Sequence, residues 1–324
     1  MTVDAREEVW PLKQTFRISR GSRTEARVVG VTVTDEKHVG RGEAVPIRRY
    51  NQTIESVLAQ IESFKAAANL DRERLQELLP AGAARNAVDC ALWDLEAKRS
   101  STRVWELAKI ETVAEVVTSF TISLDSPEKM AAAATSARGL PMLKLKLGGD
   151  ELDLPRVEAV RKAASNTRLL VDANESWSPD HYRNIAPKLK GLGVEVIEQP
   201  FPADTDEVLA TLDHPVPVCA DESCHTTADL SGLKNRYEMI NVKLDKTGGL
   251  TEALRLCERG REMGFKILIG CMVGTSLSMA PARVVASIAD YVDLDGPLLL
   301  ARDRNDGLPY QNGKIGLPSP QLWG

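Results

Sequence analysis

Aromatic residues are scarce in this 324-residue sequence, at 5% of positions, and the net charge at pH 7 is −5. A protein that binds nucleic acid usually has a basic surface, often with aromatic side chains on which bases stack, and neither is indicated here. Apolar runs of about 20 residues, long enough to cross a bilayer, are also missing. We therefore expect neither a nucleic-acid partner nor a membrane partner.

Cysteines are few and show no pairing pattern. The set is odd in number and scattered, which is typical of free thiols in a reducing cytosol; its members are Cys90, Cys219, Cys224, Cys257 and Cys271. A zinc site on Cys219, Cys224 and His225 would lack a fourth ligand and a known spacing. The charged N-terminal segment MTVDAREEVW has no apolar signal-peptide core. We expect a cytoplasmic protein, and the sequence leaves a monomer or a homo-oligomer open.

The pattern of the chain changes at about residue 110. Before that point, EARVVGVTVTDEKHVGRGEAVP alternates apolar and polar residues around a charged turn and predicts a β-hairpin. Helical stretches follow at 53–68, 71–79 and 84–100. We predict an α+β domain over residues 1–110, to which the tail 307–324 returns.

Residues 111–306 alternate short β-rich runs with helical stretches. The predicted strands are 116–122, 142–147, 168–172, 194–198, 216–221, 239–243, 265–270 and 291–294, and helices are predicted at 126–138, 154–164, 179–189 and 249–263. Such alternation indicates parallel strands joined by helices. Eight strands at this spacing favour a closed α/β barrel over an open sheet.

Three acidic residues end consecutive predicted strands: Asp172 in LLVDANESW, Glu198 in VIEQP and Asp221 in VCADES. The intervals, 26 residues (198 − 172) and 23 residues (221 − 198), are each one βα unit. Carboxylates meeting at the same end of a barrel repel one another unless a cation neutralises them. An oxygen-only set suits Mg²⁺, so we predict a magnesium site. Singly, each acid could instead cap the helix that follows it.

Lysines mark two other strands. LKLKLGGD places Lys144 and Lys146 on one face of the second strand, and MINVKLDKTGG carries Lys243 and Lys246 at the sixth. Strands two and six face each other in a ring of eight, so Lys146 and Lys243 would flank whatever the metal holds. Positive charge from Lys144 and the metal would favour loss of a proton from Lys146. A lone K-x-K could be a charged edge strand, but a closed barrel has no edge.

Two bases on opposite faces of a carbon acid suit inversion of configuration. One lysine removes the α-proton of a carboxylate, the metal stabilises the resulting enediolate, and the opposite lysine delivers a proton to the other face. Chemistry of this kind, with a lysine base and Mg²⁺, occurs in enolase-superfamily sites.

On these motifs the sequence resembles the dipeptide epimerases of the enolase superfamily, muconate-lactonizing-enzyme subgroup, over essentially its whole length. The resemblance implies a (β/α)7β modified TIM barrel with an N-terminal α+β capping domain and one Mg²⁺ per subunit. It implies Lys146 and Lys243 as the acid/base pair and Lys144 as a contact of the substrate carboxylate. The metal ligands would be Asp172, Glu198 and Asp221.

Two further segments resemble the parts of such enzymes that recognise a dipeptide. YVDLDGP contains Asp293 and Asp295, similar to the D-x-D motif that holds the substrate's amino group, and two carboxylates suit an ammonium ion. Read alone, it is a polar loop. Thr121, in SFTIS, matches a position that contacts the substrate carboxylate.

The segment SRGSRTEARVV resembles the loop that closes over the site and sets specificity. By that resemblance Arg23 would bind the side-chain carboxylate of the residue being epimerised, and a guanidinium matches a carboxylate well. From the residues alone, nearby arginines serve equally as candidates, namely Arg17, Arg20 and Arg27.

The resemblance implies Mg²⁺-dependent epimerisation of L-Ala-D/L-Glu dipeptides, in the recycling of cell-wall (murein) peptides. Cycloisomerases, o-succinylbenzoate synthases and N-acylamino-acid racemases of the same subgroup would share the lysines and the metal without needing Asp293 and Asp295. A dipeptide epimerase of another side-chain specificity is a further alternative. A non-catalytic peptide-binding barrel would not keep both lysines, and a Schiff-base barrel would need one buried lysine and no carboxylate triad.

Overall fold

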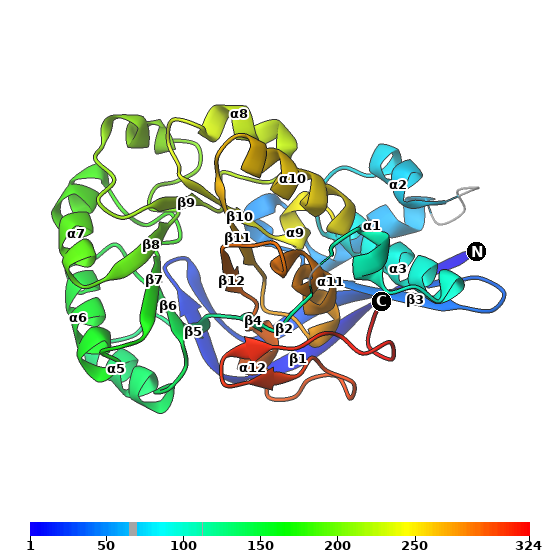
Figure 1. Cartoon of the computed structure of the whole chain (residues 1–324), viewed down its shortest axis with the longest axis horizontal. Helices are drawn as coiled ribbons and strands as arrows, with labels where there is room; N and C mark the ends of the chain where they lie inside the picture. The colour runs from blue at the N-terminus through cyan, green and yellow to red at the C-terminus, as the bar shows by residue number, and fades with distance from the viewer. Residues whose placement is uncertain (65–69, 112) are drawn as a thin grey trace.

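The computed structural model describes residues 1–64, 70–111 and 113–324. Figure 1 shows the barrel strands, green to orange, around a common centre, with the N-terminal sheet and helices, blue and cyan, extending to one side. The hairpin at the start of the chain runs from that domain across to the barrel. The two-part architecture predicted from the sequence, a barrel with a capping domain, is confirmed.

The N-terminal domain is an antiparallel sheet with helices on it. The sheet order is β1–β2–β3, with β1 (Thr2–Ile18), β2 (Gly21–Thr34) and β3 (Val39–Ala44). The short 3-10 helix η1 (Arg48–Tyr50) precedes α1 (Ile54–Phe64), α2 (Arg72–Leu78), α3 (Ala83–Ser100) and α4 (Val104–Leu107). The predicted hairpin is confirmed as β2 and β3. The end of the predicted helix 53–68 lies outside the described residues.

Strand β1 was not predicted from the sequence. It pairs with β2 along most of its length, with a register shift between Pro11 and Phe16. Proline and the charged run before it interrupt the apolar–polar alternation on which strand prediction depends. The long β1–β2 hairpin is therefore a finding of the tertiary structure, and its turn reaches the barrel.

Helix α3 packs on β3 at a distance that glycine permits. A Cβ atom on Gly40 would lie 2.0 Å from the Ala91 carbonyl oxygen, and one on Gly42 would lie 2.0 Å from that of Ala87. Residues i and i+2 of a strand share a face, so both glycines meet the same helix. Any larger residue at either position would push α3 off the sheet.

Eight parallel strands form the barrel sheet, and neighbours in the sheet are neighbours in the chain. They are β5 (Phe120–Ile122), β6 (Met142–Lys146), β7 (Arg168–Asp172), β8 (Val194–Glu198), β9 (Val218–Ala220), β10 (Met239–Val242), β11 (Lys266–Gly270) and β12 (Tyr291–Asp293). The Ser119 N–H donates to the Val292 carbonyl across the remaining gap between β5 and β12. The barrel is thus nearly closed, as predicted, although the first predicted strand is split into β4 (Val116–Val117) and β5.

Helices cover the outside of the barrel. The longer ones are α5 (Pro127–Ser136), α6 (Asp153–Ala163), α7 (Pro179–Gly191), α10 (Leu250–Glu262) and α11 (Ser276–Ala286). Shorter turns are η2 (Asp206–Thr211), η3 (Thr227–Asp229), α8 (Leu230–Leu233), α9 (Leu244–Thr247) and α12 (Gly296–Leu299). In the described part of the chain, none of the helices has the length and apolar character needed to cross a membrane.

Buried polar contacts join α3 to the segment that follows β10. Asp89 accepts hydrogen bonds from the Thr251 N–H (3.0 Å) and hydroxyl (2.6 Å). The Arg85 guanidinium donates to the Thr247 carbonyl at 2.6 Å and the Gly248 carbonyl at 3.2 Å. The capping domain therefore holds the turn at the end of the short helix that follows Lys243.

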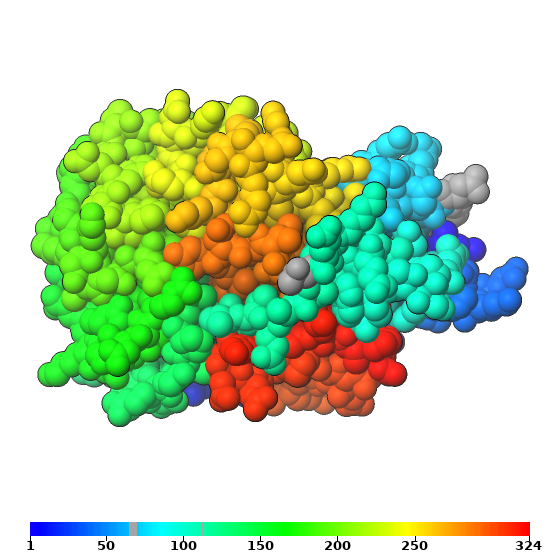
Figure 2. Space-filling model, in the orientation of Figure 1, coloured from blue at the N-terminus to red at the C-terminus, as the bar shows by residue number. Residues whose placement is uncertain are grey.

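The C-terminal tail runs beside the start of the barrel's first strand and then back to the N-terminal domain. Its strands β13 (Tyr310–Gln311) and β14 (Lys314–Ile315) form a small sheet with β4, which precedes β5. The chain then ends on α3, where the Trp323 indole N–H donates to the Cys90 carbonyl at 3.0 Å. Figure 2 shows this tail, in red, beside the teal segment of the first domain.

Candidate active site

The barrel interior is apolar towards the N-terminal ends of its strands and polar at their C-terminal ends. The apolar layer consists of Met142, Leu170, Val196, Cys219, Met239 and Leu268. Two residues further along the same strands, and so on the same inward face, come Lys144, Asp172, Glu198, Asp221, Asn241 and Gly270. Strand alternation alone therefore stacks a polar layer at the C-terminal ends of the strands, where barrel active sites lie.

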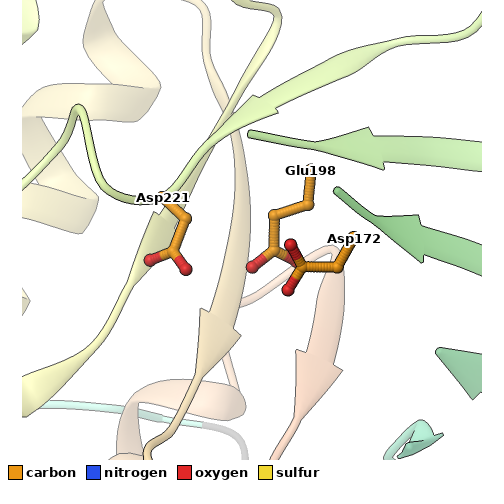
Figure 3. Close-up of side chains that lie close together, drawn as sticks. All are labelled: Asp172, Glu198 and Asp221. Carbon is orange, nitrogen blue, oxygen red and sulfur yellow. The ribbon is translucent and has the colours of Figure 1, made fainter. Parts of the chain in front are cut away.

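Three carboxylates converge in this layer. Asp172 and Glu198 end β7 and β8 and are register partners, and Asp221 follows β9 directly. One oxygen from each lies within 4.8 Å of the others, and all three residues are buried. In Figure 3 the carboxylates of Glu198 and Asp172 lie close together and Asp221 lies opposite them. The acids predicted from their spacing are thus brought together.

Lysines lie against both ends of this row. Lys146 Nζ is 2.5 Å from Asp172 Oδ2, and Lys243 Nζ is 2.6 Å from Asp221 Oδ2. Lys144 Nζ lies 2.7 Å from Glu198 Oε2 and 3.3 Å from Asp172 Oδ2. Strands β6 and β10, which place Lys146 and Lys243, are four positions apart in the sheet.

The carboxylates control the charge of two of these lysines. Burial favours a neutral amine, but Asp293 and Glu198 outweigh it and raise the pKa of Lys144 well above its usual value. Burial likewise opposes the charge of Lys243, and the carboxylates, Asp221 foremost, raise its pKa nevertheless. The charged form of Lys243 is therefore favoured while Asp221 lies ionised beside it.

The pKa values of the carboxylates shift in different directions according to their neighbours. Burial and the charge of Asp172 raise the pKa of Glu198 to about 8. Burial also disfavours charge on Asp172, but Lys146 and Lys144 hold its pKa below the ordinary range. A site that keeps three carboxylates so close, with one of them reluctant to ionise, favours a further cation.

The predicted amine-binding acids lie beside the predicted carboxylate contact. Asp295 Oδ2 accepts the backbone N–H of Thr121 at 2.6 Å, and Asp293 accepts from the Ser119 hydroxyl. Asp293 Oδ2 is also 2.8 Å from Lys144 Nζ. Burial and the neighbouring charge of Asp293 raise the pKa of Asp295 to about 7. Asp295 thus lacks a cationic partner among the described residues.

The four candidate arginines have different surroundings. Arg20 is 2.6 Å from Glu222 and 3.0 Å from Glu175. Arg17 pairs with Asp125 at 3.7 Å and Arg27 with Glu7 at 2.5 Å. Arg23 has no carboxylate partner among the described residues; its guanidinium lies 5.7 Å from the Phe16 ring centroid, and burial lowers its pKa. Of the four, Arg23 is the one left available to an external carboxylate.

Several supporting residues were given no role from the sequence. Asn241 Nδ2 donates to Glu198 Oε1 at 2.9 Å, and alternation with Lys243 could have predicted that it faces inward. Lys246 Nζ lies 2.7 Å from Asp221 Oδ1 and 2.9 Å from the Asn241 carbonyl. Gln199 contacts segments distant in sequence, for which the sequence carries no local signal.

The donor set fits a hard divalent cation. Asp172, Glu198 and Asp221 offer only oxygen ligands from adjacent strand ends, which suits Mg²⁺ with waters or substrate completing the coordination. In the described residues, no other group of His, Cys, Asp or Glu side chains has this geometry. The cysteine–histidine alternative for zinc therefore finds no support there.

Family comparisons agree with this architecture. Residues 1–108 match the mandelate racemase/muconate lactonizing enzyme N-terminal domain, and residues 128–321 match the enolase C-terminal domain-like family. The L-Ala-D/L-Glu epimerase of Escherichia coli K12 is 45% identical over 320 residues, which cover 98% of this chain and 99% of that protein. The N-acetyl-D-glutamate racemase of a Pseudoalteromonas species is 43% identical over 301 residues, covering 92% and 95%.

Solved structures are similar over the whole chain. An enolase family member from Agrobacterium tumefaciens, with homology to dipeptide epimerases and with bound sodium and L-Ala-L-Glu, has a TM-score of 0.98 at 48% identity, covering 100% of this chain and 99% of its own. A dipeptide epimerase from Enterococcus faecalis, complexed with Mg and L-Leu-L-Tyr, has a TM-score of 0.92 at 28% identity, covering 98% and 97%.

Proposed function

This chain belongs to the mandelate racemase/muconate lactonizing enzyme family of the enolase superfamily and is an isomerase, and we propose that its reaction is the Mg²⁺-dependent epimerisation of L-Ala-D/L-Glu dipeptides. The E. coli relative is an epimerase of that name, and the A. tumefaciens relative was solved with L-Ala-L-Glu.

The observation that carries the proposal is the position of two lysines at opposite ends of one row of carboxylates. Lys146 lies against Asp172, and Lys243 lies against Asp221. A substrate α-carbon above that row has an amine on each side, which suits removal of a proton from one face and delivery to the other. A binding protein has no need of this arrangement.

The two lysines exchange roles between the epimers. For one epimer Lys146, as the free amine, takes the α-proton and Lys243, as the ammonium, protonates the opposite face; for the other epimer the roles reverse. When held by the three acids, Mg²⁺ supplies positive charge that stabilises the negative charge developing on the substrate carboxylate. Lys144 stays an ammonium and adds positive charge beside Lys146 and, in this proposal, contacts that carboxylate.

We assign the substrate's amino group to Asp293 and Asp295. Asp295 is buried without a cationic partner among the described residues, so an ammonium would stabilise its charged form. Thr121, whose N–H already binds Asp295, places its side chain beside the same subsite, and we assign it to the substrate carboxylate.

Replacing Arg23 with methionine is expected to lower kcat/KM for L-Ala-L-Glu by about 10- to 100-fold, because charge-assisted hydrogen bonds to a carboxylate contribute about 1.5–3 kcal/mol. Activity towards L-Ala-L-Met should fall much less. Steady-state kinetics with both dipeptides provide the measurement. The matched control is Arg27→Met, because Arg27 is exposed and already paired with Glu7. Unchanged selectivity in Arg23→Met would remove Arg23 from the substrate site.

The reaction itself is tested by proton exchange. Incubation with L-Ala-L-Glu and Mg²⁺ in D₂O is expected to replace the Glu α-proton with deuterium and to produce L-Ala-D-Glu, because each lysine exchanges its protons with solvent. The measurement is the decay of the Glu α-proton signal by NMR, with the Ala α-proton as internal control. A Mg²⁺-bound protein that leaves both α-protons untouched would contradict the proposal.

A second candidate is racemisation of an N-acylated glutamate, favoured by 43% identity to the N-acetyl-D-glutamate racemase. An N-acetylated amino acid carries no ammonium, so it offers nothing cationic for the Asp293–Asp295 pair to bind. The same exchange assay with N-acetyl-L-glutamate decides between the two. Faster exchange with the acylated amino acid than with the dipeptide would establish the second candidate.

The cellular setting is a prediction from the family. We expect the enzyme to act in the recycling of cell-wall peptides, in the cytoplasm, where the free thiols of its five cysteines are stable.

A further inference from the structure

Gln199 directly follows β8 and contacts the C-terminal ends of the two neighbouring strands that carry carboxylates, β7 and β9. It follows Glu198 on β8, and its carbonyl accepts the N–H of Glu175, in the loop after β7, at 2.9 Å. Its own N–H donates to the Cys219 carbonyl of β9 at 2.9 Å. The residue is fully buried and has a φ of 34°, a left-handed conformation that costs a non-glycine residue free energy.

The side-chain amide adds a direct contact to Asp221. Gln199 Oε1 accepts the backbone N–H of Asp221 at 2.8 Å and that of Ser223 at 3.1 Å. Because backbone N–H groups can only donate, the orientation of the amide is fixed. The turn that carries Asp221 is therefore held from the strand that carries Glu198.

The nitrogen end of the amide is held equally firmly. Nε2 lies 2.9 Å from the Phe201 carbonyl, 2.8 Å from the Ser223 hydroxyl and 2.9 Å from the Tyr237 hydroxyl. The Tyr237 and Ser223 hydroxyls both donate to buried Asp206. This polar network lies outside the metal ligands and keeps the amide from rotating.

We propose that Gln199 is the positioning residue of the metal site, which holds the three strand ends so that Asp172, Glu198 and Asp221 converge on one cation. The inference rests on the proposed function in that these acids bind Mg²⁺. Loss of the amide leaves the buried N–H of Asp221 and the partly buried N–H of Ser223 without their acceptor, so the turn relaxes and Asp221 withdraws from the other two acids.

The required chemistry explains why the residue is a glutamine. One end must accept from two backbone N–H groups, and the other must donate to a carbonyl. A glutamate has no donor for Phe201, and an asparagine is one methylene too short to span both ends. Among common side chains, an uncharged amide of this length satisfies both.

The test is Mg²⁺ affinity, measured by isothermal titration calorimetry on the full chain without substrate. Gln199→Met, which keeps the length and loses the polarity, is expected to weaken Mg²⁺ binding by about 10- to 100-fold, as changes behind metal ligands typically do. Gln199→Asn keeps an amide and should weaken it in the same direction. If Gln199→Met fails to fold, the asparagine variant decides the question.

The matched control is Tyr237→Phe. It removes the hydroxyl that contacts both the nitrogen end of the same amide and Asp206, and it leaves the contact with Asp221. We expect a lower Tm but an Mg²⁺ affinity close to that of the wild type. If the folded Gln199 variants have a lower Tm but bind Mg²⁺ with the affinity of the wild type, Gln199 is only a structural residue and the inference is wrong. If the wild-type protein itself binds no Mg²⁺, the metal site in the proposed function fails and the inference with it.

Discussion

Replacing Lys146 or Lys243 with alanine is expected to lower kcat for epimerisation by about 10²- to 10⁴-fold, the range attributed to a positioned general acid or base. Each variant leaves one face of the α-carbon without a group to take or give a proton, so inversion cannot be completed. The measurement is the rate of conversion of L-Ala-L-Glu to L-Ala-D-Glu, followed by polarimetry.

Proton exchange separates this mechanism from a one-base alternative. A variant that keeps one lysine should still exchange the α-proton of one epimer with D₂O, because that lysine faces it, while it fails to exchange the other epimer. The two variants should show opposite preferences, which also assigns each lysine to its epimer. Lys266→Ala is the control, since Lys266 is exposed at the other end of β11. Wild-type turnover in either active-site variant would refute the two-base mechanism.

Removal of the metal is expected to have an effect of similar size. Dialysis against EDTA should reduce kcat/KM by about a thousandfold or more, because a cation at a developing negative charge contributes several kcal/mol. Without it, Lys243 stays paired with Asp221 and remains protonated, so the loss has two causes. Activity should return when Mg²⁺ is added back, and initial rates at increasing Mg²⁺ provide the measurement.

Stability offers a check that is independent of activity. A ligand that binds only the folded protein stabilises it by a free energy that grows with the logarithm of the ligand concentration relative to Kd, so Mg²⁺ should raise the Tm of the wild type. Glu198→Gln should reduce that rise, because one of the three acidic ligands is lost. Full activity of the EDTA-treated protein, with no metal detected by elemental analysis, would contradict a metal-dependent reaction.

The carboxylate cluster was predictable because the geometry of a barrel fixes where the ends of its strands lie. Parallel strands joined by βα units bring all their C-terminal ends to one face, so Asp172, Glu198 and Asp221 had to meet once the strands were recognised. Period-two alternation put Lys144 and Lys146 on the same inward face. In the structure one oxygen from each of the three acids lies within 4.8 Å of the others, and Lys144 and Lys146 both lie against Asp172.

The partners of these charges were not predictable in the same way. The residues of the segment that contains Arg17, Arg20, Arg23 and Arg27 give no reason to prefer one, and Arg23 was favoured only through the family resemblance. Only the folded chain pairs Arg20 with Glu222, 202 residues away, and leaves Arg23 without an acid partner among the described residues. Likewise, Lys144 is found against Asp293, 149 residues away.

By itself, the sequence determined the barrel, the β2–β3 hairpin of the capping domain, the charged layer at the strand ends and the chemistry which that layer suits, because these follow from local periodicity and from the connectivity of βα units. Tertiary structure decided the course of β1, the partner of each arginine and lysine, and the position of Gln199 among three strand ends. Those features depend on contacts between residues far apart in the chain. Burial excludes water as a competing partner, so each of these hydrogen bonds and ion pairs is stronger than it would be at the surface.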